Sequence, residues 1–143
     1  MIYLDSSALV KKYVFEPGSR RVLDLVSKAS LRATSKLAWP EILSGLGRKR
    51  REKGITEKDY KRAAEVFVAD WNSFLIVEFQ DELLPLIQEL SNRHALKGAD
   101  LVHLASVLWL QEAAREQMIL VASDAKLLKA AKDEELEVID PER

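Results

Sequence analysis

The strongest constraint on the fold is the regular alternation of short apolar runs with longer segments of helical periodicity. Each apolar run spans only a few residues, and the segment after it repeats its apolar side chains at helical spacing. Strands that alternate with helices pair in parallel, so the pattern predicts an α/β fold with helices on both faces of a parallel sheet. The expected strands cover residues 2–4, 31–34, 74–79, 118–122 and 137–139, and the expected helices cover 6–14, 19–29, a segment ending near 53, 56–72, 81–96, 98–117 and 124–132.

The composition limits the chemistry that this chain can perform. Its 143 residues suit a single domain spanning 1–143, and 48% of them are hydrophobic, which suffices for a core. The absence of cysteine excludes disulfides, thiolate metal sites and a cysteine nucleophile. A net charge of −1 means that any nucleic-acid binding must come from a local basic patch. No apolar run approaches the roughly 20 residues of a membrane span, and a strand from residue 2 leaves no room for a signal peptide, so we expect a cytoplasmic protein without membrane contact.

Four acidic residues recur at matching places in this pattern. Asp5 and Asp124 follow expected strands directly, and Glu41 and Asp100 lie early in expected helices. In open α/β sheets, ligands bind beyond the carboxyl ends of the strands, so these acids should meet at one edge. Carboxylate oxygens are the ligands that Mg²⁺ and Mn²⁺ prefer, and crowded carboxylates repel one another unless a cation or protons separate them. The set predicts a Mg²⁺ or Mn²⁺ site for hydrolysis of a phosphodiester.

Each acid taken alone has a simpler interpretation, because an aspartate at a strand end is most often a helix cap. The set of four in matching contexts favours a site. Other enzyme classes lack their signatures here. A dinucleotide-binding dehydrogenase needs a glycine-rich turn that residues 5–10 do not contain, and an aspartate-based phosphatase needs an acid where Ser7 stands. A zinc site lacks ligands, since the chain has two histidines and no cysteine.

The motifs that carry these acids resemble those of PIN-domain ribonucleases, and within that family those of the VapC-type toxins. The resemblance covers essentially the whole chain. It rests on LDSSALVKKY (4–13), WPEILSGLGRKR (39–50), ADLVHLASV (99–107) and LVASDAKLLKAA (120–131). It implies a Rossmann-like three-layer sandwich with a parallel sheet of about five strands. The family's acidic cluster falls on Asp5, Glu41, Asp100 and Asp124, with Ser6 and Ser123 at the hydroxyl positions beside two of them.

The resemblance also implies an activity and partners. Members of the family bind Mg²⁺ or Mn²⁺ and cut RNA, so the four acids would be both catalytic residues and metal ligands. A VapC-type toxin further implies a cognate VapB-type antitoxin, a homodimer, and a hetero-oligomer with that antitoxin. The alternative function is a catalytically silent PIN domain that binds RNA or a protein partner.

The supporting side chains each have two interpretations. Ser6 either caps the first helix or hydrogen-bonds to a carboxylate or to metal-bound water, and Ser123 has the same two roles beside Asp124. His103 lies one turn after Asp100 and is expected to pack against the strands with its nitrogens satisfied rather than to act as a general base.

Basic and aromatic residues are the remaining candidates for contacts with partners. A dense cationic run would either complement the dipole at a helix C-terminus or contact RNA phosphates. The possible RNA-binding residues are Arg48, Lys49, Arg50, Arg51, Lys11 and Lys12. Tryptophans 39, 71 and 109 are expected in the core or an interface, and Val66, Phe67 and Trp71 are expected in the core or at a dimer or antitoxin contact.

Overall fold

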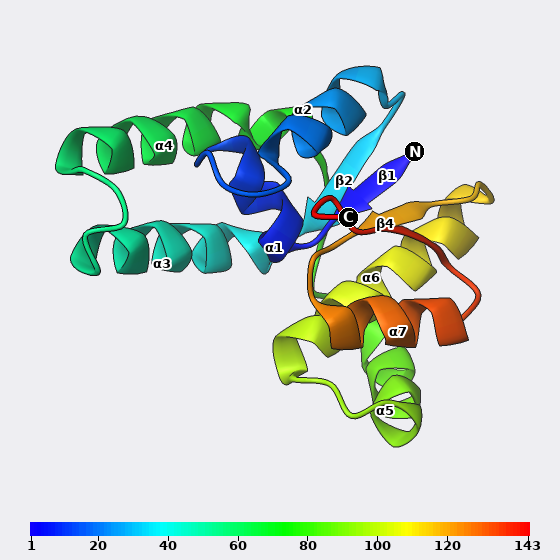
Figure 1. Ribbon diagram of the computed structural model, residues 1–143. Coiled ribbons are helices and arrows are strands. Elements are labelled where there is room, and N and C mark those ends of the chain that lie inside the picture. Colours follow the sequence, from blue (N-terminus) through cyan, green and yellow to red (C-terminus); the bar gives the residue numbers. More distant parts are fainter.

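A five-stranded parallel sheet forms the centre of the molecule in the computed structural model, which describes all 143 residues. The strand order is β3-β2-β1-β4-β5, as Figure 1 shows for the labelled strands. This arrangement confirms the predicted α/β sandwich. The strands are β1 (Ile2–Leu4), β2 (Arg32–Ser35), β3 (Leu75–Val77), β4 (Ile119–Val121) and β5 (Glu137–Ile139).

Helices cover both faces of the sheet because successive strand residues point to opposite sides. Leu4 and Val121 face a core shared with the first four helices, whereas Tyr3 and Leu120 face a core shared with the last three. The helices are α1 (Ser6–Leu9), α2 (Ser19–Lys28), α3 (Ala38–Arg51), α4 (Glu57–Asp70), α5 (Leu84–Arg93), α6 (Gly98–Ala114) and α7 (Ala125–Asp133), with 3₁₀ turns η1 (Val10–Lys12), η2 (Trp71–Ser73) and η3 (Asp81–Leu83).

The strand order reverses at the carboxyl ends of β1 and β4, the kind of switch point at which α/β folds form a crevice. From β1 the chain proceeds to β2 and β3 on one side, and it returns to β4 and β5 on the other. Connections that leave neighbouring strands in opposite directions open a gap beyond their carboxyl ends, where α/β proteins bind ligands. Asp5 and Asp124 lie at this point, directly after β1 and just beyond the end of β4.

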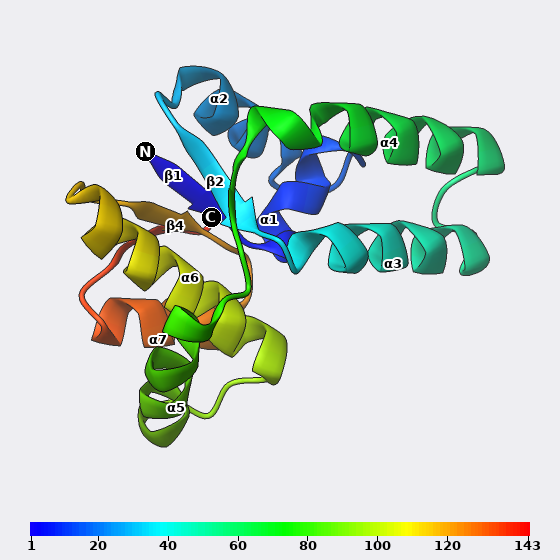
Figure 2. The same ribbon diagram turned by 180° about the vertical axis from the view of Figure 1, so that it is seen from behind.

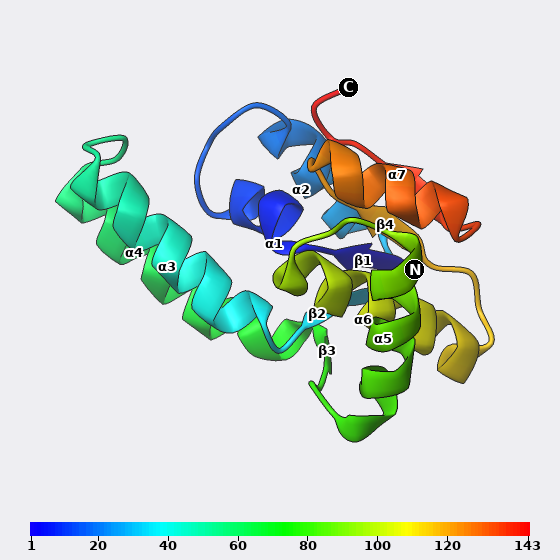
Figure 3. The ribbon, with the colours of Figure 1, turned by 90° about the horizontal axis from the view of Figure 1, so that it is seen from below.

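Helices α3 and α4 pack against each other and project away from the sheet, as Figures 1 and 2 both show. In Figure 3, seen from below, the same pair extends to one side while α5, α6 and α7 gather around the strands. Buried Leu46 and Phe67 join the two helices to the α1 side of the sheet. One face of α3 therefore stays free of contact with the rest of the fold along much of its length.

Two predicted boundaries differ from the structure for local reasons. The first helix was predicted over 6–14, but α-helix ends at Leu9 and a 3₁₀ turn continues to Lys12. The long helix predicted to reach residue 117 ends at Ala114, because Arg115 adopts a left-handed conformation with φ of 52°. None of the helices combines the length and the apolar character needed to cross a membrane.

Candidate active site

Asp5 is the buried centre of the crevice between β1 and β4. Its exposed fraction is 3%, and its Oδ1 accepts hydrogen bonds from Ser7 Oγ at 2.7 Å and from the Ala8 backbone N–H at 3.0 Å. Asp5 is thus the N-cap of α1. The expectation that Ser6 could cap this helix is wrong, because Ser6 lies one residue inside the helix and turns toward another carboxylate.

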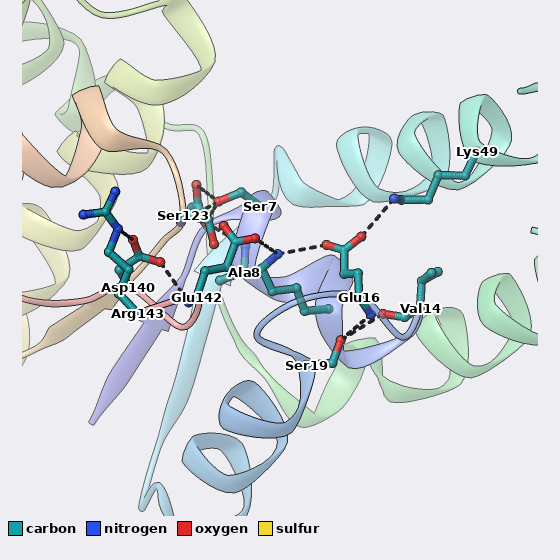
Figure 4. Close-up of polar contacts among 12 residues, drawn as sticks. Ser7, Ala8, Val14, Glu16, Ser19, Lys49, Ser123, Asp140, Glu142 and Arg143 are labelled. Carbon is teal, nitrogen blue, oxygen red and sulfur yellow. Dashed lines mark hydrogen bonds and ion pairs between the residues drawn. The ribbon is translucent and has the colours of Figure 1, made fainter. Parts of the chain in front are cut away.

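Ser7 joins the two turns that form the crevice. Its hydroxyl contacts both carboxylate oxygens of Asp5 and accepts a hydrogen bond from the Ser123 backbone N–H at 3.0 Å (Figure 4). Sequence reasoning considered Ser7 only as a missing acid and therefore missed this role. Ser123 Oγ is buried and has no hydrogen-bond partner within the protein. The Ser123 hydroxyl therefore neither caps a helix nor contacts a carboxylate, the two roles expected for it.

Glu41 lies in the first turn of α3 and is held by two side chains from other elements. Its Oε1 accepts a hydrogen bond from Ser6 Oγ at 2.5 Å, and His103 Nε2 lies 2.7 Å from the same oxygen. Burial acts to raise the pKa of Glu41, but the hydrogen bonds from His103 and Ser6 outweigh it and leave the pKa below its usual value. Glu41 is therefore an ionised acceptor, and His103 donates to it through Nε2.

His103 is almost completely buried, with an exposed fraction of 1%, and its other nitrogen is also satisfied. Nδ1 lies 2.8 Å from the hydroxyl of Tyr3, which is fully buried on β1. Burial raises the pKa of Tyr3 well above its usual range, so the hydroxyl keeps its proton and donates a hydrogen bond to Nδ1. The prediction that His103 packs with both nitrogens satisfied is confirmed. Sequence reasoning missed the contribution of Tyr3, because the residue lies in an apolar strand and no local pattern predicts a partner for its hydroxyl.

Asp100 and Asp124 complete the anionic side of the crevice. Asp100 lies in the first turn of α6, and Asp124 caps α7 by accepting a hydrogen bond from the Leu127 backbone N–H at 2.9 Å. Burial raises the pKa of Asp100, and the negative charges of Asp124 and Glu41 raise it further. Burial also raises the pKa of Asp5, and the charge of Asp100 raises it further. The charge of His103 and the hydrogen bonds from Ser7 and Ala8 act to lower it. The pKa values of Asp5 and Asp100 thus both respond to neighbouring acids at this edge of the sheet.

The chemistry of this crevice fits a divalent cation. The four candidate ligands are all carboxylates, the donors that hard cations prefer, and two of these carboxyl groups have raised pKa values that a nearby cation would lower. The unpartnered Ser123 hydroxyl beside Asp124 is a further free oxygen at the site. No group of three or more acidic or histidine side chains is arranged in the structure so that it could hold a metal ion as it stands.

The predicted basic candidates divide into paired and free residues. Lys11 is buried, with its ammonium 3.0 Å from Glu16 and 3.6 Å from Glu142, so its prediction as an RNA contact is wrong. Lys12 pairs with Asp70 at 2.5 Å. Lys49 pairs with Glu16 at 2.9 Å, a contact drawn in Figure 4.

At the end of α3, Arg50 lies 3.6 Å from Glu57 and stacks over the ring of Tyr60. Arg48 and Arg51 are exposed and form no ion pair. Lys97, which sequence reasoning missed, is exposed at the start of α6, and its charge acts on both Glu41 and Asp100.

The tryptophans pack within the fold, as predicted. Trp39 and Trp71 contact each other and the ring of buried Phe67 between α3 and α4, and Trp109 packs against the opposite core. Val66 is 46% exposed and takes no part in this cluster.

Comparison with known proteins agrees with this geometry. Residues 2–133 match the PIN domain family model. Ribonuclease VapC45 and Ribonuclease VapC49, both from Mycobacterium tuberculosis, are each 34% identical to this chain over 112 residues, covering 76% of this chain and 75% of theirs. A toxin-antitoxin complex from Klebsiella pneumoniae has the same fold, with a TM-score of 0.68 at 15% identity over 99% of this chain and 98% of that one. The chain therefore belongs to the PIN domain family.

Proposed function

We propose that this protein is a metal-dependent endoribonuclease and the toxin component of a type II toxin–antitoxin pair. The observation that carries the proposal is the crevice at the ends of β1 and β4, where Asp5 is buried beside Asp100 without a contacting lysine or arginine. Two relatives with 34% identity are named ribonucleases, which supports RNA as the substrate. Buried, unmatched carboxylates cost stability, so they indicate a functional role rather than a structural one.

Mg²⁺ or Mn²⁺ is the proposed cofactor, and Asp5, Asp100, Asp124 and Glu41 would hold it. Bound there, such an ion would lower the pKa of a water molecule and offset negative charge on the phosphoryl group. The chain's own residues orient the carboxylates. Ser7 and the Ala8 N–H fix Asp5, while Ser6 and His103 fix Glu41. Because His103 donates to Glu41 through Nε2, we assign it an orienting role and no role as a general base.

Cleavage of a panel of labelled RNAs in the presence of EDTA, Mg²⁺ or Mn²⁺ tests the activity. We expect internal cleavage only with a divalent ion, and we expect Asp100→Asn to abolish it. Glu112→Gln, an exposed acid at the far end of the same helix, is the matched control and should cleave normally. If the wild-type protein binds these RNAs and leaves them intact with saturating metal, the alternative of a catalytically silent binding module is correct.

Metal binding itself has a separate readout. Mn²⁺ should raise the melting temperature of the wild-type protein by stabilising the folded state, and the effect should be lost in Asp100→Asn and kept in Glu112→Gln. Equal shifts in all three proteins would place the metal elsewhere.

We further propose that the partners are an RNA substrate, a cognate VapB-type antitoxin and a second copy of this chain. One protein with the same fold was solved as a toxin-antitoxin complex, which supports the antitoxin. An RNA substrate implies action in the cytoplasm. Co-expression with the product of a neighbouring short reading frame tests the pairing: a stable complex in which cleavage is inhibited is expected, and independent purification of two active proteins would contradict it.

A further inference from the structure

The free face of α3 contains a glycine that the fold of the chain does not explain. Gly45 lies within this helix, where glycine is less favourable than alanine. A Cβ added at Gly45 would meet no atom within 4 Å, so no packing contact requires the glycine. Its φ is not positive, so no left-handed turn requires it. The space over Gly45 is therefore available to something outside the chain.

Gly45 lies on the helical face that leads away from the acidic crevice. Helical spacing places it one turn after Glu41, and Arg48 follows one turn after Gly45. The adjacent face of α3 is buried through Ile42 and Leu46, whereas Glu41 and Gly45 are partly exposed and Arg48 is exposed. Glu41 and Arg48 are about 10 Å apart along the helix axis.

Two unpaired cations lie on the helices that carry Glu41 and Asp100. Arg48 is exposed and forms no ion pair, whereas its neighbours Lys49 and Arg50 pair with acids. Lys97 is exposed and unpaired at the start of α6, and its charge acts on Glu41 and Asp100. A polyanion that brings one phosphate to an acidic site needs cations for the phosphates on either side.

We propose that single-stranded RNA crosses the site along this path, with one phosphate on Arg48, its backbone passing over Gly45 beside Glu41, and another phosphate on Lys97. The proposal rests on the proposed ribonuclease function and names the path of its substrate. It replaces the predicted patch over residues 48–51, because Lys49 and Arg50 already have partners within the fold. Glycine serves at the centre of the path because it lets a nucleotide approach the helix backbone closely.

The two cations are tested by RNA binding at several salt concentrations. Fluorescence anisotropy of a short, labelled, mixed-sequence single-stranded RNA is measured in the Asp5→Asn background, so that cleavage does not interfere. Arg48→Ala and Lys97→Ala should each weaken binding several-fold and reduce the slope of log K against log salt concentration by about 0.7. Lys61→Ala, which removes an exposed and unpaired lysine from α4, should change neither quantity.

The role of Gly45 is tested by a substitution that should increase stability and decrease RNA binding. Gly45→Ala should raise the melting temperature, because alanine is the better helix former, and should weaken RNA binding several-fold. Asn92→Ala, an exposed substitution in α5 that also improves helix propensity, should raise the melting temperature and leave RNA binding unchanged.

RNA binding of Gly45→Ala at the wild-type level, or unchanged salt slopes for Arg48→Ala and Lys97→Ala, would overturn the proposed path. If Gly45→Ala instead alters the sedimentation coefficient while RNA binding is unchanged, the face serves a second copy of the chain and the proposal is also overturned. These results leave the proposed function standing as long as the wild-type protein cleaves RNA. A wild-type protein that neither binds nor cleaves RNA contradicts the proposed function itself.

Discussion

The segment from Asp5 to Lys11 has a buried charged side chain at each end. Lys11 has partners of opposite charge within the fold, and Asp5 forms no ion pair. Lys11, 5% exposed, has carboxylates of Glu16 and Glu142 at 3.0 and 3.6 Å. Asp5, 3% exposed, contacts a hydroxyl and a backbone N–H, and burial raises its pKa, to which the charge of Asp100 adds. The ion pairs of Lys11 join η1 to the loop that carries Glu16 and to the C-terminal segment that carries Glu142. Unmatched charge at the Asp5 end lowers stability and is kept for binding and chemistry.

The largest effect is expected at the unmatched end. Asp5→Asn should reduce RNA cleavage by about 10³-fold or more, because several kcal/mol of transition-state stabilisation depend on the carboxylates. The free energy of unfolding should rise, since asparagine also caps helices well and removes a buried charge that has no partner. Initial cleavage rates and urea denaturation measure the two quantities. A variant that cleaves at the wild-type rate would remove Asp5 from the site.

The next effect is expected at the matched end and on stability instead of activity. Lys11→Met should lower the free energy of unfolding by about 3 kcal/mol, the lower end for breaking a buried pair, because Glu16 keeps Lys49 as a partner. Lys28→Met, which breaks an exposed pair with Asp24 on α2, should cost less than about 0.5 kcal/mol. Urea denaturation compares them. Equal losses in the two variants would show that burial of Lys11 contributes nothing.

A smaller effect, on both stability and cleavage, is expected at Tyr3, which holds His103 in place beside Glu41. Tyr3→Phe removes the hydroxyl that donates to His103 Nδ1 and should lower the free energy of unfolding by about 1–2 kcal/mol. Cleavage should also fall, because the ring of His103 is then free to turn and Glu41 loses its fixed donor. Thermal denaturation and cleavage rates measured on the same preparation test this. Lower stability with a normal cleavage rate would show that Tyr3 acts only in packing.

The smallest effect is a pH dependence at the matched end. Burial acts to raise the pKa of Glu16, but hydrogen bonds from Lys49 and Lys11 bring it below its ordinary value of 4.5. A carboxyl group with a lowered pKa in the folded state stabilises it above the unfolded pKa, and this contribution disappears as the pH falls through the folded value. Glu16→Gln should therefore cost about 1 kcal/mol at neutral pH and progressively less below pH 4.5. A difference that stays constant with pH would exclude Glu16 as the titrating group.

Much of the fold followed from patterns that are local in the chain. The apolar runs predicted the five strands, and the acids at 5, 41, 100 and 124 lie at the ends of strands and in the first turns of helices, as predicted. Such features depend on residues a few positions apart, so periodicity and capping rules apply to them. The capping role of Asp5 instead of Ser6 was a one-residue error, because both side chains cap helices well.

The contacts that orient the site could not be predicted in this way. Tyr3 and His103 are separated by 100 positions, and Ser7 and Ser123 by 116. Lys11 had the same local signal as an exposed lysine, and only the positions of Glu16 and Glu142 around it explain its burial. No local rule distinguishes a cation that pairs within the fold from one that remains free. The predicted RNA-binding residues therefore included both paired and unpaired cations.

The sequence by itself determined the alternation of strands and helices, the identity of the acids and the family resemblance, because each is written in short-range spacing. Tertiary structure alone decided which charges are matched and which are not. Parallel strands from distant parts of the chain bring their carboxyl ends together at the point where the strand order reverses, and burial there strengthens every electrostatic interaction. Asp5 therefore lies near other acids at this edge of the sheet, whereas the ammonium of Lys11 lies 3.0 Å from Glu16 and 3.6 Å from Glu142, two acids outside the strands.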